Sequence, residues 1–238
     1  MKQAISHFDT SMEIVDALIG LEGSYNDPPD QSSQSTVTGL RCAILLLMVA
    51  TFEDFARRSV EEFINELSKN FNTDPSCDFN KLPEKIILHH YFSTLELATK
   101  GPRFELTEKK DRLADIMQAC KNIINNNLNP QAFTNTYGNP NSQTLRSVYG
   151  GLNILNIFNA IKEEFFIVWQ KSEIESFIAD KLDEIVVLRH SIAHTTSFSN
   201  KSRQDVLIYN RFIRVLVNSI TIFLNSHVET VMNNTKEH

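Results

Sequence analysis

Residues 172–194 read SEIESFIADKLDEIVVLRHSIAH, and the apolar residues in this stretch recur every three or four positions. Such spacing is typical of an amphipathic α-helix. Ser172 followed by Glu175 matches a capping box, so we expect the helix to begin there. The stripe that predicts the core-packing face consists of Ile174, Phe177, Ile178, Leu182, Ile185, Leu188 and Ile192.

The same helix carries apolar residues and two histidines outside that stripe. At about 100° per residue, these residues fall largely on the opposite side of the helix. A helix that is apolar on two sides has to be covered on two sides. One cover is the core of the protein, and we expect the other to be a second copy of the chain in a homodimer. The residues concerned are Val186, Val187, His190, Ala193 and His194.

The end of this helix carries the residue types that can cleave a phosphodiester without a metal. Arg189 can hold a phosphate through its fork of N–H donors, and His190 or His194 can transfer protons at neutral pH. Arg189 and His194 are five residues apart, which is roughly 140° around a straight helix. A site that uses both residues therefore needs a bent helix end, the long reach of the arginine, or copies from two subunits.

The Arg-x4-His pattern of Arg189 and His194 resembles the active-site motif of HEPN-domain ribonucleases. About 130 residues earlier, residues 53–58, EDFARR, resemble the Glu-x3-Lys/Arg-Arg element found in an earlier helix of several of these nucleases. The alternative interpretation is a Glu53–Arg57 salt bridge on a solvated helix face, which would contribute only about 0.3 to 0.5 kcal/mol.

Two further stretches extend the resemblance, namely residues 139–154, NPNSQTLRSVYGGLNI, and residues 182–195. They look like the HEPN branch that is associated with RiboL and PSP genes. This resemblance implies an all-α, HEPN-like helical bundle with additional helices and loops. It also implies a metal-independent endoribonuclease that leaves 2′,3′-cyclic phosphate and 5′-hydroxyl ends on RNA.

The roles of individual residues are implied by the same resemblance. In related domains the residue after the arginine is often Asn, whereas here it is His190, so the identity of the main proton-transfer group stays open. The implied setting is a toxin–antitoxin or phage-defence system in which an antitoxin or regulatory protein restrains the nuclease. The alternative is a non-catalytic dimeric module that binds a protein partner. The expected catalytic residues are Arg189, His194, His190 and Glu53, and the expected RNA-binding residues are Arg57 and Arg58.

The composition and the absence of certain motifs argue against several other classes of protein. With 238 residues, 42% of them hydrophobic, we expect one HEPN-like domain over residues 1–238. The sequence has no G-x-G-x-x-G or G-x4-G-K-[ST] motif, and its three cysteines are widely separated, so we expect no cofactor and no metal. Residues 43–50 form an apolar run too short for a membrane span, and the first residues lack a signal-peptide pattern. These features favour a cytoplasmic protein.

The net charge of −6 gives no attraction of the whole protein for RNA, so binding has to rely on local cations. The arginines expected to supply them are Arg41, Arg57, Arg58, Arg189, Arg203, Arg211 and Arg214.

The rest of the chain predicts further helices at about 3–19, 37–70, 83–100 and 105–128. The Asn-rich segment 121–141 predicts a loop excursion. Ser202 and Asp205 predict the start of a last helix that packs along one long neighbour. The residues expected on the buried side of helix 37–70 are Leu40, Ile44, Leu47, Phe55, Phe63 and Leu67, and those on the last helix are Val206, Tyr209, Ile213, Leu216, Ile220 and Phe223.

Overall fold

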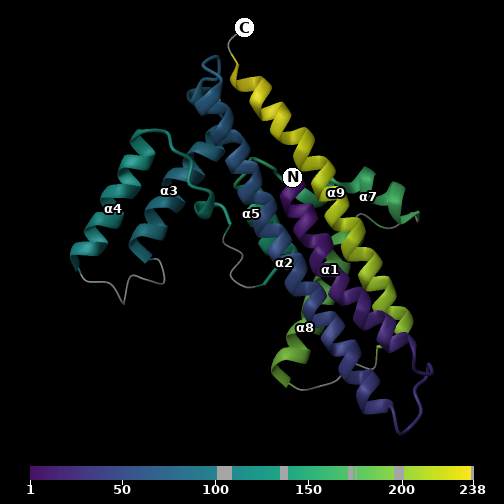
Figure 1. Ribbon diagram of the computed structural model, residues 1–238. Coiled ribbons are helices and arrows are strands. Elements are labelled where there is room, and N and C mark those ends of the chain that lie inside the picture. The colour runs from purple at the N-terminus through teal and green to yellow at the C-terminus, as the bar shows by residue number, and fades with distance from the viewer. Residues whose placement is uncertain (101–108, 135–138, 171–173, 175, 196–200, 237–238) are drawn as a thin grey trace.

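The computed structural model describes residues 1–100, 109–134, 139–170, 174, 176–195 and 201–236, and every regular element within these residues is helical. The predicted all-α fold is confirmed. Three long helices lie side by side and pack on one another (Figure 1). They are α1 (Lys2–Gly23), α2 (Gln34–Thr73) and α9 (Arg203–Thr235).

The shorter helices form two groups around these long helices. The first group is a hairpin of α3 and α4 that projects away from the bundle (Figure 1). In the second group, α5 and α8 pack on α2, and α7 packs on α9. The bounds are α3 (Glu84–Lys100), α4 (Lys109–Ile124), α5 (Ser142–Gly150), α6 (Ile157–Ala160), α7 (Lys162–Trp169) and α8 (Phe177–Thr195), with 3-10 turns η1 (Phe79–Lys81) and η2 (Pro130–Ala132).

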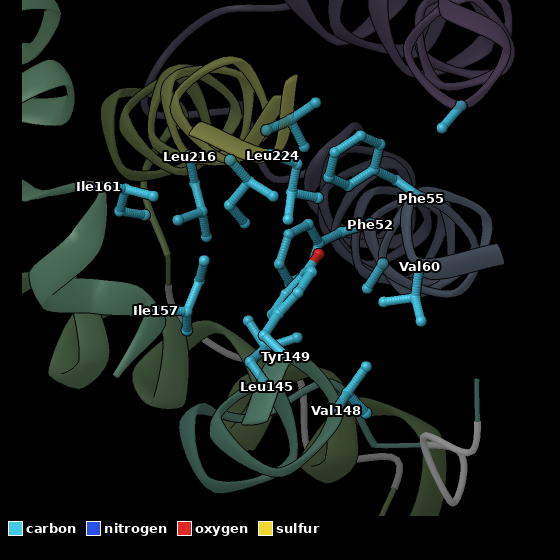
Figure 2. Close-up of a cluster of buried hydrophobic side chains, with 14 of the residues drawn as sticks. Phe52, Phe55, Val60, Leu145, Val148, Tyr149, Ile157, Ile161, Leu216 and Leu224 are labelled. Carbon is cyan, nitrogen blue, oxygen red and sulfur yellow. The ribbon is translucent and has the colours of Figure 1, made fainter. Parts of the chain in front are cut away.

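Tyr149 of α5 fastens the second group to the core. Its side chain points from α5 toward Phe52 of α2 and is fully buried (Figure 2). The phenol oxygen and the hydroxyl of Ser59 on α2 are 3.0 Å apart and hydrogen-bonded. Burial raises the pKa of Tyr149 well above its ordinary value, so the phenol stays neutral. The buried hydroxyls of Ser59 and Tyr149 thus satisfy each other and fix the position of α5 on α2.

The last helix begins as predicted. The Asp205 N–H donates to Ser202 Oγ at 3.2 Å, and the Ser202 N–H donates to Asp205 Oδ2 at 2.9 Å, which completes a capping box. The predicted stripe from Val206 to Ile220 is buried and Phe223 is half-buried, and α9 packs along α2. The predicted capping box at Ser172 lies outside the described residues.

Two predicted core residues are instead exposed. Leu47 of α2 is 40% exposed because it lies off the face formed by Ile44, Leu45 and Met48. Ile174 is 71% exposed and precedes the described start of α8. The Asn-rich segment also differs in part from a loop, because α4 continues to Ile124 and η2 packs on α2 and α3.

Apolar windows of 18 residues within α2 and α9 are long and apolar enough to cross a membrane, by length and composition alone. In the structure, 39% of the α2 window and 50% of the α9 window are buried within the bundle. The core helices of a bundle have this composition because they are covered by other helices. The absence of a membrane span stays a prediction.

A buried carboxylate joins the ends of the three long helices. Glu22, at the end of α1, is 2% exposed and accepts from Arg41 of α2 and from Arg203 of α9, with distances between 2.6 and 2.8 Å. Burial alone would lower the pKa of Arg41, but hydrogen bonds to Asp27 and Glu22 raise it above its ordinary value. Arg41 and Arg203, two of the expected RNA-binding cations, are therefore held by structural contacts.

We predict that Glu22→Ala lowers the free energy of unfolding by about 3–5 kcal/mol, because it leaves two partly buried guanidinium groups without their shared carboxylate. Urea denaturation followed by circular dichroism measures the effect. The control is Asp16→Ala, which removes the exposed partner of Arg214 and should cost about 1 kcal/mol or less. Equal losses for the two variants would contradict the structural role of Glu22.

Candidate functional site

The candidate site is at the C-terminal end of α8, and the register of this helix decides which side chains face the core. Ala179 and Val186 are buried there, whereas Leu188 and Ile192 are only half-buried. The predicted stripe is buried at Ile178, Leu182 and Ile185, and the buried face extends beyond it to Ala179 and Val186. Arg189 follows Val186 by three positions, so it lies on the packing side of α8.

The guanidinium of Arg189 has no partner among the described residues. Arg189 is half-buried, and its side chain forms no hydrogen bond or ion pair with any residue that the structure describes. Because α8 is one continuous helix, Arg189 and His194 are separated by roughly 140° around its axis. A single α8 therefore directs the two side chains to different sides.

The two histidines of the motif lie together. The ring centroids of His190 and His194 are 4.4 Å apart, with the rings tilted by 45°, and both side chains are exposed. Val187, on the same side of α8, is 62% exposed. The second apolar side of the helix that the sequence predicts is thus open in the protomer, apart from Val186, which is buried.

His190 lies at the edge of a groove between α5 and α8. The groove has a volume of about 720 Å³, which is within the range of small-ligand sites. It joins two stretches that are about 40 residues apart in the sequence. Its lining consists of Asn139, Asn141, Ser142, Gln143, Arg146, Asp183, Val186, Val187, His190 and Ser191.

A chain of hydrogen bonds crosses this groove from α8 to α5. Asp183 accepts from the backbone N–H and from the hydroxyl of Ser142, both at 2.7 Å. Arg146 in turn donates from Nη1 to Ser142 Oγ at 3.2 Å. The Arg146 guanidinium also lies over the ring of Phe158, 5.0 Å from its centroid. Asp183 thereby fixes the start of α5 and, through Ser142, helps to orient Arg146.

In the earlier motif, residues 53–58 of α2, the two arginines pair with a neighbouring carboxylate. Arg57 and Arg58 are exposed, and both pair with Asp54, at 3.0 and 2.5 Å. Arg58 lies over a separate hollow beside α1, with Glu61 among the acidic residues around it. Neither arginine lines the groove of His190. Their proposed contact with RNA stays a prediction.

Glu53 lies on another side of α2 from that hollow. It is half-buried and shares a helical stripe with the buried residues Val49, Ala56 and Val60. Val60 points from α2 toward the side on which α5 lies (Figure 2). The register thus places Glu53 at the edge of a packing face, and its catalytic role stays a prediction.

Two other arginines that were expected to bind RNA form structural contacts in the fold. Arg211 donates to the carbonyl of Trp169 at 3.0 Å, and Arg214 pairs with Asp16 at 2.7 Å. Arg146 was not among the cations expected from the sequence, although it lies within the family-like stretch 139–154. No spacing rule connects it to α8, because the groove depends on how α5 and α8 pack.

Most of the chain matches a known protein family. The model of the RiboL-PSP-HEPN family matches residues 11–226. The chain belongs to the RiboL-PSP-HEPN family. The family resemblance drawn from the motifs is thus confirmed, and HEPN domains are commonly related to ribonucleases. No curated protein and no solved structure matches the chain.

Within the part of this HEPN domain that the structure describes, no three His, Cys, Asp or Glu side chains are grouped so that they could hold a metal ion. The groups near the end of α8 are Arg189 and two imidazoles, and the groove beside them adds amide and hydroxyl side chains and the carboxylate of Asp183. Such groups bind phosphate and transfer protons.

We predict that Arg189→Ala changes the free energy of unfolding by no more than about 0.5 kcal/mol, because its guanidinium has no partner among the described residues. Asp183→Ala, on the same helix, should cost about 1–2 kcal/mol, because it leaves two donors of Ser142 without their acceptor. Urea denaturation of both variants tests this contrast. If Arg189→Ala lowered the free energy of unfolding more than Asp183→Ala does, the main role of Arg189 would be to stabilise the fold.

Proposed function

We propose that this HEPN domain is a metal-independent endoribonuclease whose site includes Arg189, His190 and His194. The observation that carries the proposal is the arrangement at the end of α8. A guanidinium that has no partner among the described residues is followed by two exposed imidazoles whose ring centroids are 4.4 Å apart. The chain belongs to the RiboL-PSP-HEPN family, and Arg189 and His194 have the spacing of the Arg-x4-His motif.

The chemistry of such a site is transesterification within the RNA strand. The 2′-hydroxyl oxygen attacks the adjacent phosphorus while one imidazole accepts its proton. The P–O5′ bond breaks, and the departing oxygen receives a proton from a second group, which leaves a 2′,3′-cyclic phosphate and a 5′-hydroxyl. Arg189 neutralises the charge that develops on the non-bridging oxygens. The proximity of His190 and His194 suits an exchange of acid and base roles between them.

A homodimer would complete this site. Arg189 and His194 lie on different sides of α8, so one phosphate would be served by the histidine of one protomer and by the arginine of its partner, whose long side chain would extend from the packing side toward the interface. The side of α8 that carries Val187, His190 and His194 is exposed in the protomer and would form the interface. Burial of this side would also exclude water from the developing charge.

The cellular role that we propose is that of a toxin or effector in a toxin–antitoxin or phage-defence system. A cytoplasmic ribonuclease of this kind harms its host unless an antitoxin or regulatory protein restrains it. RNA would be its substrate, and no cofactor enters the proposed reaction.

The second candidate function is a non-catalytic dimeric module that binds a protein partner. One observation favours it, which is the apolar surface on the projecting α3–α4 hairpin. Leu88 and Phe92 of α3 are exposed there, as are Leu113, Met117 and Ile124 of α4. Exposed apolar residues at helical spacing are typical of surfaces that bind other proteins.

We predict that the purified protein cleaves single-stranded RNA in the presence of EDTA and leaves cyclic phosphate ends. His194→Ala should abolish cleavage, and Arg189→Lys should reduce it about tenfold or more, because lysine keeps the charge but loses the bidentate hold on phosphate. Gel analysis of a labelled RNA, with and without phosphatase, identifies the ends. A cleavage that needs magnesium, or that leaves 3′-hydroxyl ends, would contradict this mechanism, and no cleavage at any concentration would favour the binding module.

We predict that the protein is a dimer in light scattering and that Val187→Glu makes it monomeric, because a carboxylate would be buried in the interface. Ile167→Glu, at a position on α7 that is 70% exposed, is the control and should stay dimeric.

Mixing Arg189→Ala with His194→Ala tests whether the site is shared between protomers. About half of the dimers are then mixed, each with one of two composite sites intact, so about a quarter of the activity should return. No recovery after verified exchange of subunits would contradict a shared site.

A further inference from the structure

The groove between α5 and α8 contains a cation that the proposed cleavage reaction does not use. Arg146 lines this groove together with His190, Val186 and Val187. It extends from α5, whereas the reacting groups extend from α8. Its role must therefore be sought in what the groove binds next to those groups.

Arg146 is held in place on two sides. Its Nη1 donates to Ser142 Oγ at 3.2 Å, and its guanidinium stacks over Phe158 at 5.0 Å. Arg146 forms no ion pair with a carboxylate of the described residues. Since one hydrogen bond uses only one of its five N–H donors, the others can bind a ligand. The two contacts reduce the conformational entropy that the side chain would lose on binding.

The groups that cap this end of α5 are already engaged. The Ser142 N–H donates to Asp183, and the Thr144 N–H donates to the side chain of Asn141 at 2.8 Å. Both oxygens of Asp183 accept hydrogen bonds from Ser142. The helix N-terminus is thus capped by the protein itself, which makes the guanidinium of Arg146 the strong anion-binding donor on the α5 wall of the groove.

We infer that the groove is a nucleotide subsite in which Arg146 binds a backbone phosphate of the RNA, next to the phosphate that is cleaved at the end of α8. Val186 supplies an apolar contact for a ribose or base, and Val187 borders the groove on the side of the proposed dimer interface. This inference rests on the proposed endoribonuclease function. Asp183 is a positioning residue, because it holds the Ser142 hydroxyl that accepts from Arg146.

The consequence for the substrate is that the strand extends from the α8 end toward α5. A strand bound in this groove contacts both His190 and Arg146, since both line it. Gln143, exposed at the same groove, presents an amide of the kind that forms hydrogen bonds with base edges. The bound nucleotide is therefore part of single-stranded RNA, whose bases are accessible.

Fluorescence anisotropy with a labelled, single-stranded 20-nucleotide RNA tests the subsite. The parent protein carries His194→Ala, so that the RNA is not cleaved. Adding Arg146→Ala should weaken binding about tenfold, because it removes a charge-assisted contact with phosphate. It should also reduce the slope of log K against log salt concentration by about 0.7, as expected for one phosphate contact with a single strand.

Two further variants test whether the loss of affinity is specific to the position and the guanidinium of Arg146. Lys121→Ala removes the same charge from the exposed end of α4 and should leave both affinity and salt slope unchanged. Arg146→Lys should retain the salt slope and recover only part of the affinity, because it keeps the charge without the fork of donors. Circular dichroism and the urea midpoint verify that each variant is folded.

The outcomes distinguish the subsite from the nuclease. If Arg146→Ala binds RNA like its parent, or if the parent binds no RNA, the subsite is excluded even where the wild-type protein cleaves RNA. If the wild-type protein cleaves nothing but Arg146→Ala loses affinity and salt slope as expected, the subsite stands and the nuclease is excluded.

Discussion

The burial of α2 is the constraint on which the other helices depend. This helix of 40 residues has buried side chains on several faces, so it needs partners on more than one side. α1, α9, α8 and α5 each pack on it. Figure 2 shows how one of these contacts is made, with Phe52 of α2, Tyr149 of α5 and Leu216 of α9 gathered in one cluster. A change in the packing of α2 would therefore displace every helix that carries the candidate site.

The position of the groove follows from α2 through two hydrogen-bonded links. Ser59 of α2 is fully buried and its hydroxyl is paired with Tyr149, which fixes α5. Asp183 of α8 then accepts two hydrogen bonds from Ser142 at the start of α5. These hydrogen bonds restrict the motion of α5 and α8, because Ser59 and Tyr149 are buried and Asp183 accepts two hydrogen bonds. The site is thus supported by the core although its reacting groups are exposed.

Some arginines of the protein are held in ion pairs, whereas others are available to bind a ligand. Arg41 and Arg203 share the buried carboxylate of Glu22, and Arg214 pairs with Asp16. Arg146 and Arg189, in contrast, form no ion pair with the described residues. With a net charge of −6, the protein has little general attraction for nucleic acid. Binding would depend on a few placed cations, which favours selective contact with RNA.

The sequence alone was sufficient for the features that depend on local pattern. Helical periodicity and capping chemistry predicted an all-α bundle and the start of α9 at Ser202, because these signals involve residues within two turns of one another. The spacing of Arg189 and His194, with the stretch 139–154, led to the family that the comparison shows. The separation of those two side chains around α8 also followed from helix geometry.

Tertiary structure decided which side chains are available and what they face. Periodicity did not predict that the buried face of α8 extends to Ala179 and Val186, because this depends on the shapes of α2 and α5. Periodicity also could not predict that Arg146 lines the same groove as Asp183 and His190, since α5 and α8 are about 40 residues apart in the sequence. Whether an arginine is paired or free depends on contacts between distant segments, and those are formed only when the helices pack.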